Sequence, residues 1–225
     1  MQTSSMRAPS QYADPAAWRR EPRGLTQVLD AVFAVNSQLL DALASSARGE
    51  AIQFPLSESL RERAARLTLE ERRRAARSGV FLVDANLIDF SCWREAALRG
   101  ESAPPEDLPV PWLPIEESRS LAHSALLVAW YVVHADPAVA RVLLGMSASG
   151  VAAYWELSVA DLAQIARCHP ECVRPRWPHR LDVWSELMES ACHGGTQEYR
   201  STMIRCLELS AGDLKWLSAY VEHAV

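Results

Sequence analysis

Apolar residues recur at three- and four-residue steps along most of the chain, which is the spacing of one face of an α-helix. The first such run extends from Leu25 to about Gly49, and a second helix is predicted to end near Arg66. The short apolar run Phe81–Val83 is strand-like but too isolated to build a sheet. The pattern therefore predicts an all-α fold, a multi-helix bundle of roughly ten helices.

The strongest helix pattern lies in the centre, from Leu121 to Val133, and a break at Asp136-Pro137 follows it. Further short helices are predicted from Ala138 to Leu144 and from Ser147, with one more helix after the proline-stiffened run 174–180.

Three helix starts carry a capping box, in which a hydroxyl accepts from the backbone N–H three residues on and an acid returns the bond. Each follows a leucine, and the pairs are Thr68 with Glu71, Ser158 with Asp161, and Ser210 with Asp213. The last box predicts that a helix ends near Leu209 and that a separate final helix runs from Ser210 to His223.

Two parts of the chain resemble each other. Leu67–Val83 aligns without gaps on Leu157–Val173, and one inserted residue then brings Trp93 onto Trp184. One interpretation is an internal duplication. The other is coincidence, since capping boxes after leucine are common in helical proteins, and the sequence leaves both open.

The distribution of proline and polar residues suggests the organisation of the chain. Residues 1–24 are polar and aperiodic, so they are predicted to be a disordered leader. Residues 25–99 form a first helical unit, and residues 117–225 form a second unit with the C-terminal helices. Residues 100–116 hold five prolines and are predicted to be a linking arm, which Trp112 pins to the body.

Composition limits the classes of function. The 225 residues carry a net charge of −5, which argues against a chain that coats nucleic acid or an anionic membrane by itself. The longest apolar run, Ala125–Val133, is far shorter than the ~20 residues of a membrane span. Five widely spaced cysteines suit a reducing compartment. We therefore expect a cytoplasmic protein with no membrane contact.

No motif with catalytic spacing occurs, so we predict no enzyme activity, no catalytic residues and no cofactor. Cys168, His169 and Cys172 are close enough in sequence to suggest zinc. Their spacing departs from paired Cys-x2-Cys, and small buried thiols are the favoured interpretation, so we predict no metal site.

Two basic clusters are the candidate nucleic-acid contacts, because guanidinium groups on rigid turns can bind phosphates. The candidate residues are Arg72, Arg73, Arg77, Arg174, Arg176 and Arg180. The alternative is a solvated arginine face or pairing with acids of the same chain.

The central 60 residues resemble a known family. The matching features are the Leu144-Gly145-Met146-Ser147 turn, then Val151-Ala152, Leu157-Ser158, Ile165-Ala166 and the Arg174-x-Arg176-aromatic run. Leu126 to Glu186 in this way resembles the FlhD family, the flagellar master-regulator subunit of bacterial transcription. The family is about half as long and lacks both the first unit and the prolines Pro175 and Pro178.

The resemblance implies an all-α, dimerising subunit that helps a protein partner bind promoter DNA, with Arg174 and Arg176 on its basic run. Our first hypothesis is therefore a transcriptional regulator subunit that reaches DNA through a complex, as a homo- or hetero-oligomer. The alternative is a helical protein-interaction adaptor or secretion-associated scaffold with no nucleic-acid role. If the six arginines converge on one exposed face, the regulator hypothesis is favoured. If they form ion pairs with acids of the same chain, the adaptor is favoured.

Overall fold

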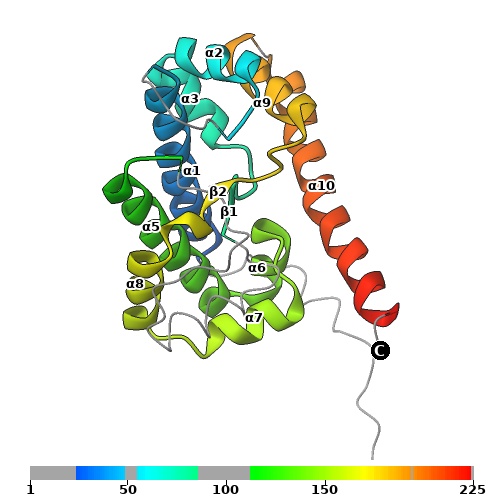
Figure 1. The fold of residues 1–225 in the computed structure, drawn as a ribbon. Coiled ribbons are helices and arrows are strands. Elements are labelled where there is room, and N and C mark those ends of the chain that lie inside the picture. The colour runs from blue at the N-terminus through cyan, green and yellow to red at the C-terminus, as the bar shows by residue number, and fades with distance from the viewer. Residues whose placement is uncertain (1–23, 49–54, 86–111, 194, 224–225) are drawn as a thin grey trace, which may run out of the picture.

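The protein is almost entirely helical in the computed structural model, which describes residues 24–48, 55–85, 112–193 and 195–223 (Figure 1). The α-helices of these residues are α1 (Leu25–Arg48), α2 (Glu58–Arg66), α3 (Leu69–Ala76), α5 (Ile115–Ala135), α6 (Pro137–Leu144), α7 (Ala148–Trp155), α8 (Val159–Cys168), α9 (Leu181–His193) and α10 (Thr196–His223). A short 3-10 helix, η2 (Pro170–Cys172), precedes the strand β2. The predicted all-α class is confirmed.

Local sequence explains where the helices begin and end. Thr68 and Ser158 cap α3 and α8, and both capping boxes are present with the acid bound back to the N-cap backbone. Asp136 caps α6 by accepting from the backbone N–H groups of Ala138 and Val139 at 2.8 and 3.2 Å. The helix ends at Gly145, whose φ of 67° is the left-handed conformation that glycine adopts without a steric penalty.

The core is built around α1 and α5, which pack against each other. α1 also packs on α2 and α3, while α5 packs on α6, α7 and α8. By length and composition α1 would be able to cross a membrane. Its place in this structure is the protein core, since eight of its side chains are buried among the neighbouring helices.

Helices of the first half of the core begin 90 residues before the corresponding helices of the second half. α1 begins at residue 25 and α5 at residue 115, and 115 − 25 = 90. α2 and α7 begin 90 residues apart, and so do α3 and α8. Six buried positions of α1 match buried positions of α5 at the same difference, namely Val28 with Ser118, Val32 with Ala122, Val35 with Ala125, Asn36 with Leu126, Leu39 with Ala129 and Leu43 with Val133.

A short strand pair joins the halves, although no sheet was predicted. β1 (Val83–Asp84) pairs antiparallel with β2 (Arg174–Pro175), so that Val83 faces Pro175 and Asp84 faces Arg174. The prediction failed because the two partners lie far apart in the chain, and neither run is long enough to show a period of two. α9, from the second half, packs across on α2 and α3 of the first.

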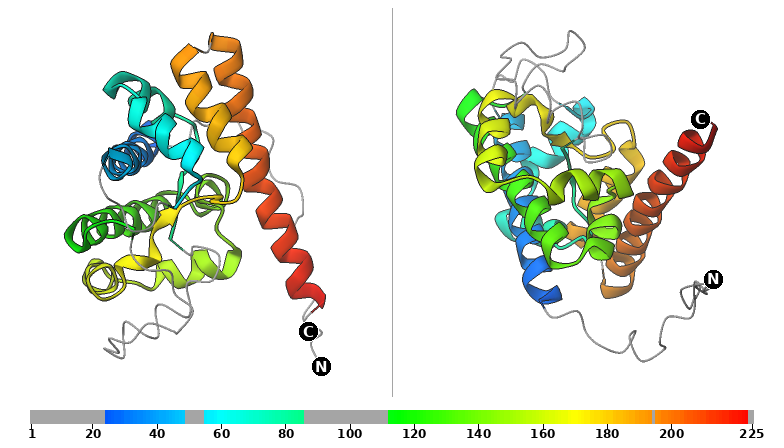
Figure 2. Two further views of the ribbon diagram at one scale, coloured as in Figure 1. Left: turned by 45° about the horizontal axis from the view of Figure 1, so that its top comes forward. Right: turned by 90° about the horizontal axis from the view of Figure 1, so that it is seen from below.

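α10 is one continuous helix of 28 residues, so the predicted helix boundary at Ser210 is wrong. The Ser210 hydroxyl instead donates to the backbone oxygen of Val142 at 3.1 Å, and Ser210 is buried. Tertiary contact with α6 therefore uses the serine that local pattern assigned to a cap. Beyond this point α10 leaves the body and projects from it in all three views (Figures 1 and 2).

Several predictions lie outside the described residues, including the leader up to residue 23, the Trp93 match and residues 100–111 of the arm. The described end of the arm agrees with expectation, because Trp112 donates to the backbone oxygen of Val173 at 3.4 Å and packs against the core. Residues 115 and 116, assigned to the arm, are instead the first two residues of α5.

Candidate functional site

Three of the six candidate arginines lie at or just after α3. Arg72 donates to the Asp41 carboxylate at 2.5 Å and to the Leu67 backbone oxygen at 2.6 Å. The guanidinium carbon of Arg77 lies 5.0 Å from the centre of the Phe33 ring, a cation–π contact. Arg73 is exposed. Two of these three arginines are thus engaged within the chain.

The other three precede α9. Arg174 donates to the Asp84 carboxylate at 3.1 Å. Arg180 binds both oxygens of Asp182 at 3.1 and 3.0 Å, and this contact lowers the pKa of the Asp182 carboxyl to about 2. Arg180 and Asp182 are exposed, Arg174 and Asp84 are partly exposed, and ion pairs in contact with solvent contribute little to stability. Arg174 and Arg180 can therefore still exchange their partners for phosphate.

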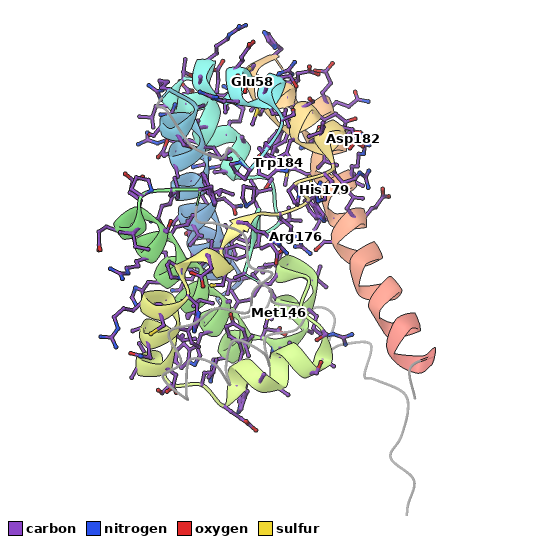
Figure 3. All side chains as sticks on the ribbon, viewed as in Figure 1. Glu58, Met146, Arg176, His179, Asp182 and Trp184 are labelled. Atoms are coloured by element: carbon purple, nitrogen blue, oxygen red, sulfur yellow. The ribbon has the colours of Figure 1, made fainter. Side chains whose placement is uncertain are left out.

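Arg176 differs from the rest because it is buried, with 6% of its surface exposed. In the view of Figure 3 it lies between Met146 and Trp184, in the middle of the molecule. Its guanidinium carbon is 4.7 Å from the Trp177 ring centre, and its backbone N–H donates to the Leu82 oxygen at 2.8 Å. The hypothesis that Arg176 contacts phosphate is not compatible with this burial, since only a rearrangement would expose it.

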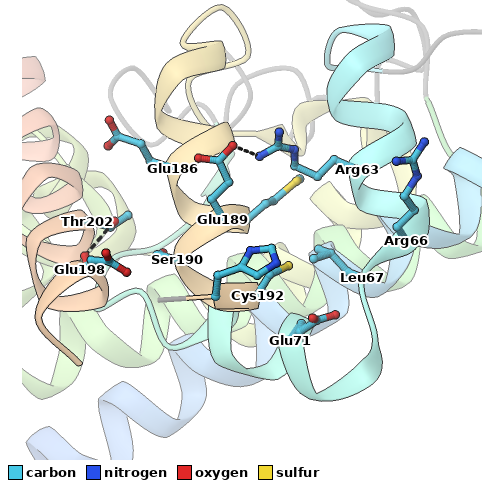
Figure 4. A pocket seen from close by; sticks show the side chains of 12 residues that line it. Arg63, Arg66, Leu67, Glu71, Glu186, Glu189, Ser190, Cys192, Glu198 and Thr202 are labelled. Carbon is cyan, nitrogen blue, oxygen red and sulfur yellow. Dashed lines mark hydrogen bonds and ion pairs between the residues drawn. The ribbon is translucent and has the colours of Figure 1, made fainter. Parts of the chain in front are cut away.

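A cavity of about 700 Å³ lies between α2 and α3 on one side and α9 and α10 on the other (Figure 4). Four glutamates line it: Glu71, Glu186, Glu189 and Glu198. All four have partners within the chain, since Glu189 pairs with Arg63, Glu186 with Arg205, Glu71 with the Thr68 N–H and Glu198 with the Gly195 N–H. These carboxylates hold helix ends and helix pairs together.

The titratable groups of this cavity do not favour nucleophilic chemistry. The Thr68 backbone N–H and hydroxyl lower the pKa of Glu71, so this carboxylate stays ionised. Burial raises the pKa of the Cys192 thiol, which disfavours the reactive thiolate. The sequence did not reveal this cavity, because its walls come from segments more than a hundred residues apart, around Arg63 and Glu189.

The cysteine and histidine candidates for zinc are engaged otherwise. His169 is buried and its Nδ1 lies 3.3 Å from Glu171 Oε1. Burial also raises the pKa of the Cys172 thiol well above its ordinary value, while Gln164 donates to Cys168 Sγ at 3.2 Å. Within the ranges that the structure describes, no three His, Cys, Asp or Glu residues gather as metal ligands would.

An exposed aromatic surface lies at the end of α7. The rings of His134 and Trp155 are stacked with centroids 4.6 Å apart, and the Trp130 ring, tilted by 33°, has its centroid 4.1 Å from that of His134. Trp155 is 53% exposed, and Val159, four residues on, is also exposed. His134 is the last residue but one of α5, and no pattern in the sequence indicated the stack.

Comparison with known proteins adds no relative: no protein-family model, no curated protein and no solved structure matches this chain.

Proposed function

We propose that the chain is an FlhD-like transcriptional regulator subunit in which two related units take the place of the two subunits of a dimer. The observation that carries the proposal is the facing pair Asp84 and Arg174. These residues are counterparts under the shift of 90 that relates α1 to α5. A residue that faces its own counterpart across an antiparallel ladder marks a two-fold axis.

The surrounding contacts support the same symmetry. α1 packs on its counterpart α5, and β1 pairs with β2, so like elements meet like elements as in a two-fold dimer. α9 crosses from the second unit onto α2 and α3 of the first, which resembles an exchanged helix in a swapped dimer. One chain would thereby present what two subunits present in the family it resembles.

Action through a protein partner fits the charge better than direct DNA binding. The chain carries a net charge of −5, Arg176 is buried, and four more candidate arginines contact groups of the same chain. Arg73 alone among the six has no such contact among the described residues. We therefore assign the greater part of phosphate binding to the partner.

The test is chromatin immunoprecipitation of the tagged chain from its own host, with the untagged strain as control. We expect enrichment of discrete promoters. The purified chain should bind those same fragments weakly and with a shallow salt dependence, because few phosphates are neutralised without the partner. Absence of promoter enrichment would contradict the proposal.

A protein-interaction adaptor with no nucleic-acid role is the second candidate, and the exposed Trp155 stack favours it. Aromatic side chains with one exposed face are frequent anchors at protein interfaces. If this function is right, promoters are not enriched. The variant Trp155→Ser should then lose cross-links to partner proteins that the matched variant Val142→Ser retains.

A further inference from the structure

The cavity between α2, α3, α9 and α10 is enclosed by helices from both units of the chain. α2 and α3 of the first unit form one wall, and α9 and α10 of the second unit form the other (Figure 4). Its volume of about 700 Å³ falls in the range of sites for small organic ligands, ~300–1,000 Å³. The regulator function proposed above makes no use of this cavity.

α9 presents a polar face to the cavity. Four polar side chains that line it lie at positions i, i+3, i+4 and i+7 of this helix, and they are Glu186, Glu189, Ser190 and His193. Seven residues of helix span about 10 Å, so these groups are spread along the wall. Among the described residues no three acids, histidines or cysteines gather at one point to hold a metal. The arrangement therefore suits an extended ligand better than a metal ion.

The charge of the lining favours a cation. Four glutamates and two arginines line the cavity, which leaves an excess of two negative charges when His193 is neutral. Arg63 and Arg66 have 38% and 80% of their side chains exposed, and each already pairs with a glutamate. A cavity with this excess of carboxylates attracts cations and repels anions.

Three of the glutamates have acceptor capacity left for a ligand. They hold their partners within the chain through one oxygen only, namely Oε1 of Glu186, Oε1 of Glu189 and Oε2 of Glu198. The second oxygen of each has no partner among the residues that the structure describes, and an ionised carboxylate accepts through both oxygens.

The cavity also has an apolar part. Leu67 and Met188 contribute side chains from opposite walls, and both residues are buried in the chain. Methylene groups that cover such side chains gain from leaving water, whereas a hydrated inorganic cation gains nothing there. The ligand that matches the whole lining has an aliphatic chain together with its positive charges.

We propose that this cavity binds a linear aliphatic polyamine, a chain of methylene groups with two or more ammonium groups. The ammonium groups donate to the second oxygens of Glu189 and Glu198, in charge-assisted hydrogen bonds. The methylene groups lie on Leu67 and Met188. Because the ligand contacts both units, its binding stabilises the packing of α9 on α2 and α3.

The experiment is calorimetric titration of the purified full chain with spermidine, with magnesium chloride at equal ionic strength as the control for charge alone. We expect one saturable site for spermidine and a higher melting temperature of the bound chain, and neither for magnesium. Binding should weaken as salt is added, since the cavity is open to solvent.

The variants Glu198→Gln and Glu189→Gln should each weaken spermidine binding about fivefold. Glutamine at position 198 still accepts from the Gly195 N–H, so the start of α10 is kept. The matched control is Glu208→Gln, which makes the same charge change at an exposed position of the same helix outside the cavity. It should bind spermidine as the wild type does. Circular dichroism checks that all three variants keep their helicity.

Three results would overturn the proposal. The first is the absence of saturable spermidine binding. The second is an equal loss of affinity in Glu208→Gln and Glu198→Gln, which would mean attraction to the acidic chain as a whole. The third is an equal affinity for n-butylamine, which has a single ammonium group. Promoter enrichment is measured separately, so the regulator function stands or fails independently of this site.

Discussion

The two units of the core share helix positions but hold their strands differently. Asn36 on α1 and Leu126 on α5 are counterparts, and both are buried. The Asn36 amide donates to the backbone oxygens of Ala76 and Val80 at 3.0 and 2.8 Å, and it accepts from the Leu82 N–H at 2.9 Å. A leucine side chain can form none of these bonds.

The second unit does not need these bonds because the 3-10 helix η2 precedes its strand. The backbone groups there bond to each other: the Cys172 N–H donates to His169 O and the Val173 N–H donates to Pro170 O. The first unit has no such turn before β1, so Asn36 supplies the partners from another helix. The comparison shows that one backbone arrangement accepts an amide or an apolar residue, provided that buried backbone groups are bonded.

The largest expected effect comes from Asn36→Leu. It removes the Asn36 bonds of the buried Ala76 oxygen and Leu82 N–H, and it leaves the Val80 oxygen with the Ser78 hydroxyl alone. We expect a loss of at least about 3 kcal/mol in the free energy of unfolding. The matched variant Leu126→Met conserves volume and should cost less than about 1.5 kcal/mol. Urea unfolding measures both. Equal losses in the two units would show that Asn36 does not hold β1.

Gly145→Ala is expected to have the next largest effect. Gly145 has a φ of 67°, and a Cβ there would lie 1.9 Å from an Arg176 guanidinium nitrogen. An alanine at this φ costs ~1–2 kcal/mol in backbone strain, and the displacement of buried Arg176 adds to this cost. We therefore expect the free energy of unfolding to fall by about 2–3 kcal/mol. The control is Gly195→Ala, where a Cβ meets no atom within 4 Å. A melting temperature of Gly145→Ala equal to that control would contradict the packing described.

The capping boxes compare the units at equivalent positions. Thr68→Ala and Ser158→Ala should each cost about 1 kcal/mol, because each leaves a first-turn N–H without its acceptor. They lie in different units and share no partner, so the double variant should lose the sum. A double variant no worse than either single variant would be inconsistent with independent caps.

These boxes also predict a pH dependence. Hydrogen bonds from Thr68 and Ser158 lower the pKa of Glu71 and Asp161 below their ordinary values of 4.5 and 3.8. A pKa depressed by folding gives stability that is present above the ordinary value and is lost as the pH falls through the folded value. Urea titrations between pH 7 and about 3 should therefore show less acid destabilisation in the double alanine variant than in the wild type.

The smallest effect tests the two-fold axis itself. Arg174→Asp sets two carboxylates opposite each other at positions 84 and 174, and we expect a loss of up to about 1 kcal/mol, since the pair is partly exposed. The double variant Asp84→Arg with Arg174→Asp should recover most of the lost stability, because the two positions are equivalent. If the double variant is less stable than Arg174→Asp, the two positions do not lie in equivalent surroundings.

Much of the helical structure was readable from the sequence. The run from Leu25, the caps Thr68 and Ser158, and the Gly145 turn lie within one or two residues of the predicted boundaries. Helix periodicity and caps depend on residues three or four apart, so a single sequence contains all the partners they need. The alignment of Leu67 with Leu157 likewise anticipated the common shift of the two units.

Tertiary structure decided the remaining features. Ser210 repeats the capping pattern of Ser158, yet it lies inside α10 because α6 offers its hydroxyl a buried acceptor. Arg176 belongs to a basic run, yet it is buried because β2 pairs with β1 and carries it inward. Sequence alone determines interactions with near neighbours in the chain. Which distant group satisfies a buried hydroxyl, amide or guanidinium is set only when the helices pack, since burial makes an unmet hydrogen bond costly.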